Sequence, residues 1–211
     1  MSTIEIRKIS ITDLDTDAIV NAANDGLWAG GGVCGAIFKA AGRAKLQAAC
    51  SKIGHCDTGS AVITPGFDLN AKYIIHAVGP RWKDGKHKEP ELLYRAYYSS
   101  LELASQYGCA SIGFPLISTG IFGYPVNGAW HDAFSACSDF LDKNPEVSLD
   151  IIFAVLDKTI LDEGHKALTG SAASRYKIAE RSDWEAKEMR CRISKRHLFF
   201  KENLHISRCL L

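Results

Sequence analysis

The sequence of 211 residues has no run approaching the roughly 18 apolar residues that a membrane-spanning helix needs. The segment Met1–Arg7 lacks the apolar core of a secretory signal peptide. Its seven cysteines include no Cys-x-x-Cys pair, and Cys50 and Cys56 with His55 between them make a poor zinc pattern. These absences predict a reduced, cytoplasmic protein with buried thiols, no membrane partner and no bound metal.

The sequence also lacks an excess of either charge, because its formal net charge is +1. Strong non-specific attraction to nucleic acid or to a membrane surface is therefore not expected. The charge is uneven, since residues 171–211 hold ten Lys or Arg and five Asp or Glu, a balance of +5 that leaves −4 on the first 170 residues. That basic segment does not show the interleaving of aromatic with basic residues that stacks on bases, so nucleic acid is not expected as a partner.

Apolar runs of strand length alternate with stretches of helical periodicity. The predicted strands are Ala18–Val20, Ala61–Thr64, Tyr73–Val78, Ser111–Leu116 and Leu149–Leu156, and the predicted helices are Gly35–Ala41, Pro90–Tyr107, Asn127–Leu141 and Asp157–Leu168. Several of these strands are apolar on both faces, which is typical of strands covered by helices on both sides. The alternation predicts a three-layer α/β/α sandwich with a largely parallel or mixed sheet.

The composition changes near residue 169. Residues 169–174 read Thr-Gly-Ser-Ala-Ala-Ser, which is typical of a linker. We predict one folded domain over residues 1–168, followed by a linker and a basic C-terminal extension over residues 169–211. Within the extension, Arg175–Met189 has the pattern of a charged helix.

The first functional signal follows the predicted strand at Ala18–Val20. Asn21-Ala22-Ala23-Asn24 is followed by Gly30-Gly31-Gly32-Val33 and then by a helical pattern. Glycine lets the backbone approach a phosphate group closely, and a helix N-terminus favours an anion. Asparagine amides supply donors and acceptors suited to sugar hydroxyls. This loop therefore predicts a site for a phosphorylated, ribose-like ligand.

The second signal follows the predicted strand at Ser111–Leu116. It reads Ser118-Thr119-Gly120-Ile121-Phe122-Gly123 and offers hydroxyls and amides to phosphate oxygens. The ring of Phe122 is suited to stacking on a sugar face. Taken alone, this segment is more simply a glycine-rich turn between a strand and a helix.

Taken together, five ordered motifs resemble the macrodomain family. They are Asn21–Asn24, Gly30–Val33, Thr58–Ala61, Ile75–Pro80, and Phe114 with Ser118–Gly120. The resemblance covers about residues 3–168. It implies a mixed six-stranded sheet between helices and a cleft for ADP-ribose, either free or on an ADP-ribosylated protein. It implies no metal and no cofactor.

The resemblance also implies roles for individual residues. Asn24 would bind the distal ribose, while Asn21 would shape its loop. The diphosphate and the distal ribose would be lined on one side by Gly30, Gly31, Gly32 and Val33. The other side of the diphosphate would be lined by Ser118, Thr119, Gly120, Ile121, Phe122 and Gly123. At the other end of the cleft, Ile11 would lie beside the adenine and Leu156 against its face.

Two positions depart from the hydrolytic MacroD-type branch of the family. That branch has an aspartate where this chain has Cys34, and a histidine where it has Phe38. A carboxylate can orient or activate water, whereas a neutral thiol does so poorly. Cys34 opens a predicted helix, which favours a thiolate, so Cys34 and Asn24 stay candidate catalytic residues. Binding of ADP-ribose is the favoured function; an ADP-ribosyl hydrolase or O-acetyl-ADP-ribose deacetylase with slow, substrate-assisted turnover is the alternative.

The adenine end departs from the family as well. Where the family has Gly-Asp-Ile-Thr, this chain reads Ile9-Ser10-Ile11-Thr12. The hydroxyl of Ser10 can accept the hydrogen bond of the adenine amino group, but it is weaker than a carboxylate by about 1 kcal/mol. We therefore predict weakened or broadened selectivity for the base.

Other hypotheses fit single features only. Gly30–Gly35 matches the Gly-x-Gly-x-x-Gly pattern of nicotinamide-dependent oxidoreductases, but these glycines do not directly follow a strand. A structural adaptor recruited through residues 175–211 would leave both glycine-rich loops unexplained. His76 lies in an apolar strand, so it is expected in the core rather than in an acid–base role.

Overall fold

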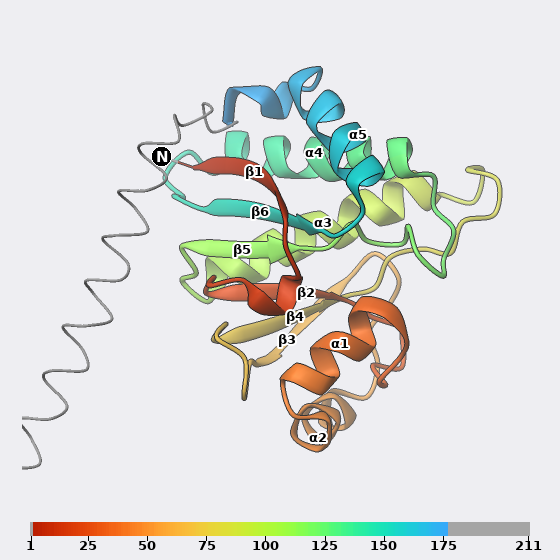
Figure 1. Cartoon of the computed structure of the whole chain (residues 1–211), viewed down its shortest axis with the longest axis vertical. Helices are drawn as coiled ribbons and strands as arrows, with labels where there is room; N and C mark the ends of the chain where they lie inside the picture. Colours follow the sequence, from red (N-terminus) through yellow and green to blue (C-terminus); the bar gives the residue numbers. More distant parts are fainter. Residues whose placement is uncertain (1, 177–211) are drawn as a thin grey trace, which may run out of the picture. The chain divides into compact units, whose positions relative to one another are not determined.

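Six strands form one mixed sheet in the computed structural model, which describes residues 2–176. They are β1 (Thr3–Lys8), β2 (Ala18–Ala22), β3 (Ala61–Pro65), β4 (Tyr73–Ala77), β5 (Ser111–Phe114) and β6 (Asp150–Val155). Their order across the sheet is β1-β6-β5-β2-β4-β3, which Figure 1 shows from top to bottom. Neighbouring strands are parallel except for β3, which runs antiparallel to β4. The predicted mixed six-stranded sheet is confirmed.

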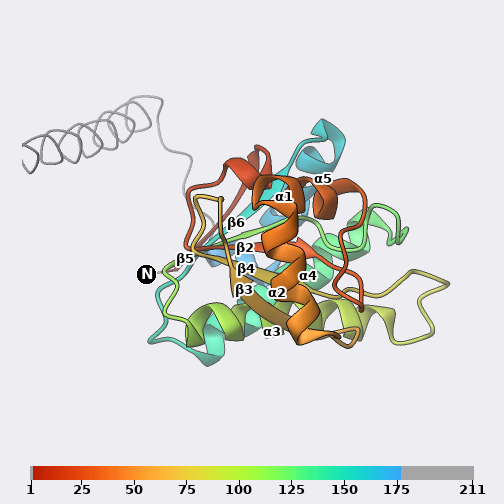
Figure 2. The ribbon, with the colours of Figure 1, turned by 90° about the horizontal axis from the view of Figure 1, so that it is seen from below.

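Helices cover both faces of this sheet (Figure 1, Figure 2). They are α1 (Gly32–Ala40), α2 (Arg43–Ile53), α3 (Glu89–Gln106), α4 (Val126–Lys143) and α5 (Lys158–Thr169), with short 3-10 turns η1 (Ile11–Asp13) and η2 (Ala172–Tyr176). The buried side chains form two clusters, one shared with α1 and α2 and a larger one shared with α3, α4 and α5. This is the predicted three-layer sandwich.

Alternate strand residues supply the two clusters, because successive side chains of a strand point to opposite faces. In β4, Ile75 and Ala77 belong to the larger cluster, whereas Ile74 belongs to the smaller one. Burial on both faces explains why these strands are apolar throughout.

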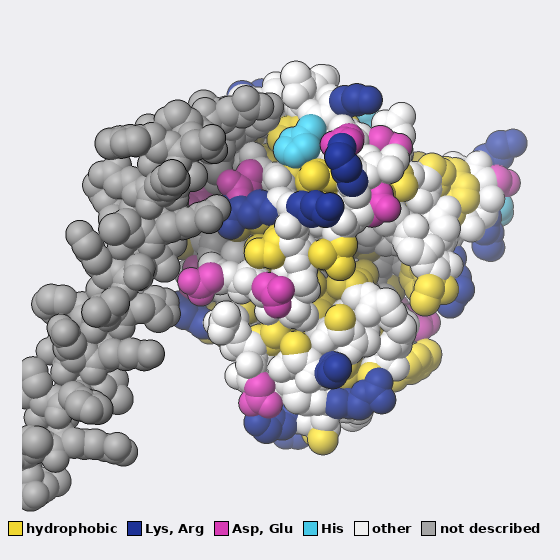
Figure 3. Space-filling model, viewed as in Figure 1, with side chains coloured by type: hydrophobic (Ala, Val, Ile, Leu, Met, Phe, Trp, Pro, Cys, Tyr) yellow, Lys and Arg dark blue, Asp and Glu magenta, His cyan; other side chains and the backbone are white. Residues whose placement is uncertain are grey.

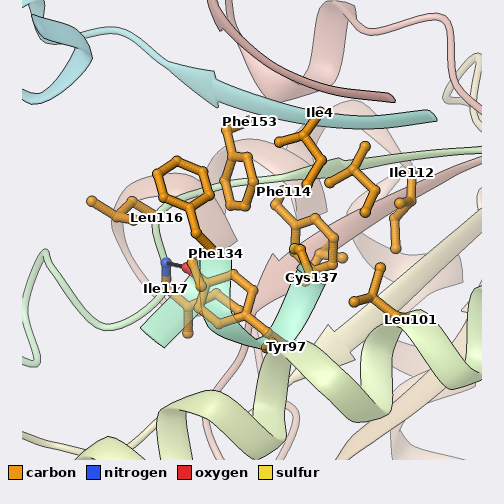
Figure 4. Close-up of a cluster of buried hydrophobic side chains, with 14 of the residues drawn as sticks. Ile4, Tyr97, Leu101, Ile112, Phe114, Leu116, Ile117, Phe134, Cys137 and Phe153 are labelled. Carbon is orange, nitrogen blue, oxygen red and sulfur yellow. Dashed lines mark hydrogen bonds between the residues drawn. The ribbon is translucent and has the colours of Figure 1, made fainter. Parts of the chain in front are cut away.

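Aromatic rings form the centre of the larger cluster (Figure 4). The rings of Phe114 and Phe153 stack with centroids 5.6 Å apart, and Phe134 meets Phe153 edge-on at 5.4 Å. Tyr97 of α3 lies against both Phe114 and Phe153 and is fully buried. The end of β5, from which the second glycine-rich loop leaves, is therefore packed into a rigid core.

Two elements have no counterpart among the predicted ranges. In β1, Ile4 and Ile6 are buried while Arg7 is exposed. The only sequence signal for this strand is therefore a short alternation of apolar and polar residues. In α2, Leu46 and Cys50 alone are buried, which gives it a weak apolar periodicity. The predicted strands and the other helices agree with the structure to within a few residues at each end.

The segment predicted to be a linker overlaps η2, which extends beyond it to Tyr176. There Ala173 is fully buried, and the hydroxyl of Tyr176 donates to Asp142 of α4 at 2.7 Å. The domain boundary at residue 168 stays a prediction. Beyond Tyr176, the charged helix predicted over Arg175–Met189 lies outside the described residues. None of the helices between residues 2 and 176 has the length and apolarity required to cross a membrane.

Candidate functional site

A cleft of about 680 Å³ opens at the carboxyl ends of β2, β4 and β5. Its lining begins with the residues that end or follow these strands, among them Ala22, Val78 and Leu116. In open α/β sheets this edge is where ligands bind. Figure 3 shows apolar side chains exposed across this part of the molecule, between α5 above and α1 below.

The first wall of the cleft is the loop after β2. The side chain of Asn24 ties this loop together through two hydrogen bonds to the backbone of Trp28. Its Oδ1 accepts the N–H of Trp28 at 3.1 Å, and its Nδ2 donates to the Trp28 carbonyl at 2.8 Å. The indole of Trp28 covers Gly26, where a Cβ would lie 1.7 Å from the ring. The loop then enters α1 at Gly32, whose φ is +57°. The N–H groups of a first helical turn have no acceptor within the helix, so this wall offers free donors.

Cys34 lies in that first turn, with 5% of its surface exposed. Its Sγ accepts the N–H of Gly30 at 3.4 Å and lies 3.7 Å from Nδ2 of Asn21. Phe38 follows one turn later, and its buried ring meets that of His76 edge-on at 6.4 Å. A thiol and an apolar ring therefore occupy the two positions at which the hydrolytic branch has a carboxylate and an imidazole.

Asn21 lies beneath the loop and not in the cleft lining, with 1% of its surface exposed. Its Nδ2 donates to Nδ1 of His76 at 3.1 Å, which leaves the ring proton on Nε2 to bond Oγ1 of Thr64 at 2.9 Å. Burial lowers the pKa of His76 to about 4, so the imidazole is neutral near pH 7. His76 is a core residue, as predicted. This buried chain of hydrogen bonds fixes the end of β2, from which the first loop leaves.

The second wall is the turn after β5. Its five successive N–H groups, from Ser118 to Phe122, have no hydrogen-bond acceptor among residues 2–176. The hydroxyl of Ser118 is also buried and has no partner in this part of the chain. Gly120 and Ile121 of this row are exposed, and a continuous row of N–H groups in a turn is the donor arrangement of an anion-binding concavity.

Other groups hold this turn in shape. The N–H of Tyr124 donates to the Ser118 carbonyl at 3.0 Å, and Oγ1 of Thr119 donates to the Leu116 carbonyl at 2.9 Å. Ser118 itself has a φ of +67°, a conformation that is strained for a side chain other than glycine. The Ser118 carbonyl and the Thr119 hydroxyl are thus bonded within the turn, whereas the Ser118 hydroxyl and the N–H row have no partner within residues 2–176.

The residues predicted to contact adenine lie outside the lining of this cleft. Leu156 follows β6 and is 67% exposed, on the same edge of the sheet because β6 neighbours β5. Ile11 is buried in η1, with 5% of its surface exposed. Oγ of Ser10 lies 2.8 Å from Oγ1 of Thr12. These residues follow β1 and β6, so they lie along the same edge of the sheet, beyond the second wall.

A third wall comes from the charged loop between β4 and α3. Its second residue, Gly79, packs so closely on the second wall that a Cβ there would lie 2.3 Å from Oγ of Ser118. The guanidinium of Arg81 lies 4.4 Å from the centre of the Phe122 ring, and the N–H of Trp82 donates to the Phe122 carbonyl at 2.9 Å. No local sequence pattern indicated that this charged segment folds back on the cleft.

The structure therefore brings most of the predicted site residues together. Those that line the cleft are Asn24, Gly30, Gly31, Gly32, Val33, Cys34, Ser118, Gly120, Ile121 and Phe122. Thr119 and Gly123 belong to the second wall without lining the cleft, and Asn21, Ser10, Ile11 and Leu156 lie outside it. Their roles toward a ligand stay predictions.

Comparison with known proteins gives concordant results. The family model described as Macro domain matches residues 20–133. An O-acetyl-ADP-ribose deacetylase of Cronobacter turicensis is 50% identical over 147 residues, which are 68% of this chain and 83% of that protein. A solved Oceanobacillus iheyensis macrodomain with ADP is 36% identical with a TM-score of 0.75, over 79% of this chain and 90% of that one. A Trypanosoma brucei macrodomain in complex with ADP-ribose is 37% identical with a TM-score of 0.72, over 78% of this chain and 68% of that one.

The mixed sheet of six strands and the two glycine-rich loops at the carboxyl ends of β2 and β5 agree with these similarities. The motifs also lie within or beside the matched residues 20–133, in the order that the resemblance requires. The chain belongs to the macrodomain family.

Proposed function

We propose that this protein binds ADP-ribose, free or linked to a protein, in the cleft between the first and second walls. The row of unpaired N–H groups from Ser118 to Phe122 carries the proposal. A diphosphate has oxygens that accept such hydrogen bonds, and its negative charge suits the N-terminus of α1 on the opposite wall. The related macrodomains solved with ADP and with ADP-ribose support this ligand class.

The remaining features of the cleft suit the other parts of this ligand. Its volume of about 680 Å³ is that of a typical small-molecule site. After its two bonds to Trp28, the amide of Asn24 still has one N–H and one oxygen lone pair, which suit a ribose hydroxyl. The proposal therefore assigns the diphosphate to the second wall and the distal ribose to the first.

The test is an ADP-ribose titration by calorimetry with Gly120→Asp and Gly120→Asn. A Cβ at Gly120 would meet no atom within 4 Å, so a side chain can begin there without a clash. The aspartate puts a negative charge beside the N–H row, so we expect it to weaken binding at least about tenfold, or 1.4 kcal/mol. The asparagine has the same shape without the charge and should cost less than about threefold. Absence of binding to the wild type, or equal losses in both variants, would overturn the proposal.

Removal of ADP-ribose from proteins, or of acetate from O-acetyl-ADP-ribose, is the second candidate function, and the name of the Cronobacter turicensis relative supports it. In the described part of the chain, the carboxylates that line the cleft are Asp25 and Glu89. Asp25 is exposed and accepts the N–H of Gly26 at 3.0 Å, while Glu89 is bonded to backbone N–H groups. With Cys34 in place of a carboxylate, activation of water would fall to the substrate's own phosphate. Binding is therefore the function that the geometry supports best.

A cytoplasmic location accords with the cysteines. The five in the described part of the chain are Cys34, Cys50, Cys56, Cys109 and Cys137, all free and buried. Free thiols persist in a reducing compartment.

A further inference from the structure

One buried carboxylate holds the loop between β4 and α3. Oε1 of Glu89 accepts the N–H groups of Lys83, Asp84 and Gly85 at 3.2 to 3.4 Å, and Oε2 accepts that of His87 at 2.5 Å. Only 2% of Glu89 is exposed. Burial alone would raise the pKa of this carboxyl, but its backbone hydrogen bonds outweigh burial and lower the pKa to about 2. The carboxylate stays charged and fixes the shape of the loop.

The other acid of the loop is also bonded internally. Oδ1 of Asp84 accepts the N–H of Lys86 at 3.0 Å and lies 3.0 Å from Nδ1 of His87. Asp84, His87 and Glu89 each place a ligand atom within 4.8 Å of the others, which is also the pattern of a metal site. Since the Glu89 oxygens already accept four N–H groups, this cluster is an anchor for the loop.

The internal bonding of both acids leaves the positive charges of the loop facing solvent. Arg81, Lys83, Lys86 and Lys88 are exposed, and none of them forms an ion pair within residues 2–176. Figure 3 shows Lys and Arg side chains gathered over this loop, at the right of the view. Arg81 and Lys83 also line the cleft. The loop therefore presents a rigid, cationic rim, which we define as Arg81, Lys83, Lys86 and Lys88.

The sheet order shows which end of the cleft this rim borders. The carboxyl ends of β6, β5, β2 and β4 follow one another across the sheet. Three strand spacings, roughly 14 Å, separate β6 from β4. With the adenine toward β6 and the diphosphate between the loops after β5 and β2, the distal ribose lies toward β4. A protein linked to that ribose therefore leaves the cleft beside Arg81 and Lys83.

We propose that the cationic rim docks an acidic peptide segment next to the ADP-ribosylated residue. This inference rests on the proposed function and extends it from the ligand to the class of protein that carries the ligand. The exposed carboxylate of Asp25 lies on the first wall, so the positive charge is confined to the side of the cleft formed by the loop after β4. Acidic residues of the partner are attracted to that side.

The test compares two synthetic peptides that carry one ADP-ribose, flanked by glutamates in one and by glutamines in the other. The full chain should bind the glutamate peptide at least about fivefold more tightly at low salt, and the preference should shrink as salt is raised. The double variant Lys86→Gln/Lys88→Gln should lose the preference and keep its affinity for free ADP-ribose, because neither residue lines the cleft. The matched control Lys52→Gln/Lys166→Gln removes the same charge from α2 and α5 and should keep the preference.

The outcomes separate this inference from the function on which it rests. The docking surface is overturned if the wild type binds the two peptides with equal affinity. It is also overturned if the double variant keeps the preference for the glutamate peptide, or if the control variant loses that preference to the same extent. If free ADP-ribose still binds in those cases, the proposed function stands. A wild type that binds neither free nor linked ADP-ribose overturns both.

Discussion

The hydroxyl of Tyr97 accepts the N–H of Ile117 at 2.8 Å in the middle of the larger core (Figure 4). The same hydroxyl lies 3.4 Å from the carbonyl of Pro115, to which it donates. Ile117 directly precedes the row of free N–H groups that begins at Ser118. A fully buried side chain of α3 therefore positions the start of the proposed diphosphate site.

Tyr97→Phe should keep the aromatic packing and leave the N–H of Ile117 without an acceptor. A buried, unpaired donor costs about 1 to 3 kcal/mol, so we expect the free energy of unfolding to fall by that amount. The affinity for ADP-ribose should fall several-fold, because the second wall loses its anchor. Denaturant unfolding and calorimetry measure the two effects. Tyr98→Phe is the control, since the Tyr98 hydroxyl has no hydrogen bond in the described part of the chain; equal effects in both variants would contradict the prediction.

Gly79→Ala should displace the second wall. The added Cβ would lie 2.3 Å from Oγ of Ser118 and 2.6 Å from Cγ2 of Ile117, so the loop must shift. We expect a loss of about 1 to 3 kcal/mol in the free energy of unfolding and an ADP-ribose affinity at least about tenfold weaker. Gly120→Ala adds the same methyl group where no atom lies within 4 Å, and it should leave both quantities nearly unchanged. Wild-type affinity in Gly79→Ala would show that the two loops are not coupled.

Cys34→Asp should create or raise turnover of mono-ADP-ribosylated protein. The N–H of Gly30 and the amide of Asn21 already point donors at this position, and the N-terminus of α1 favours a negative charge there. A carboxylate can orient water, so we expect single-turnover rates at least about tenfold above the wild type. Cys34→Asn supplies a similar volume without the charge and should give no gain. Fast turnover by the wild type itself would instead make the protein an enzyme that works without the aspartate.

His76 should make stability depend on pH. Its pKa is about 4 in the folded protein and about 6.5 in an unfolded chain, so the unfolded state binds more protons between these values. Stability is therefore lost as the pH falls from about 6.5 to about 4, by on the order of 3 kcal/mol in total. His76→Gln should remove this part of the slope in unfolding measurements at a series of pH values. His131→Gln, at a side chain that is 78% exposed, should follow the wild type, and parallel curves for all three proteins would refute the assignment.

Much of the fold could be predicted because its strands are buried on both faces. Continuous apolar runs such as Tyr73–Val78 are required wherever helices cover both sides of a sheet, so they appear directly in the sequence. In contrast, β1 lies at an edge of the sheet and, within residues 2–176, pairs with β6 alone, while α2 buries only Leu46 and Cys50. Elements with so few buried residues leave little periodicity to detect.

The sequence by itself determined the two glycine-rich loops, because backbone that must approach an anion needs glycine, and such residues lie close together along the chain. Only the tertiary structure decided which groups surround them. In the sequence, nothing distinguishes Glu89 from other acidic residues near the start of a helix. In the structure, its carboxylate accepts backbone N–H groups of the preceding loop and holds that loop in place. Arg81 reached the cleft because β4 lies beside β2 in the sheet. Contacts between residues far apart in sequence depend on strand order and register, which no local pattern encodes.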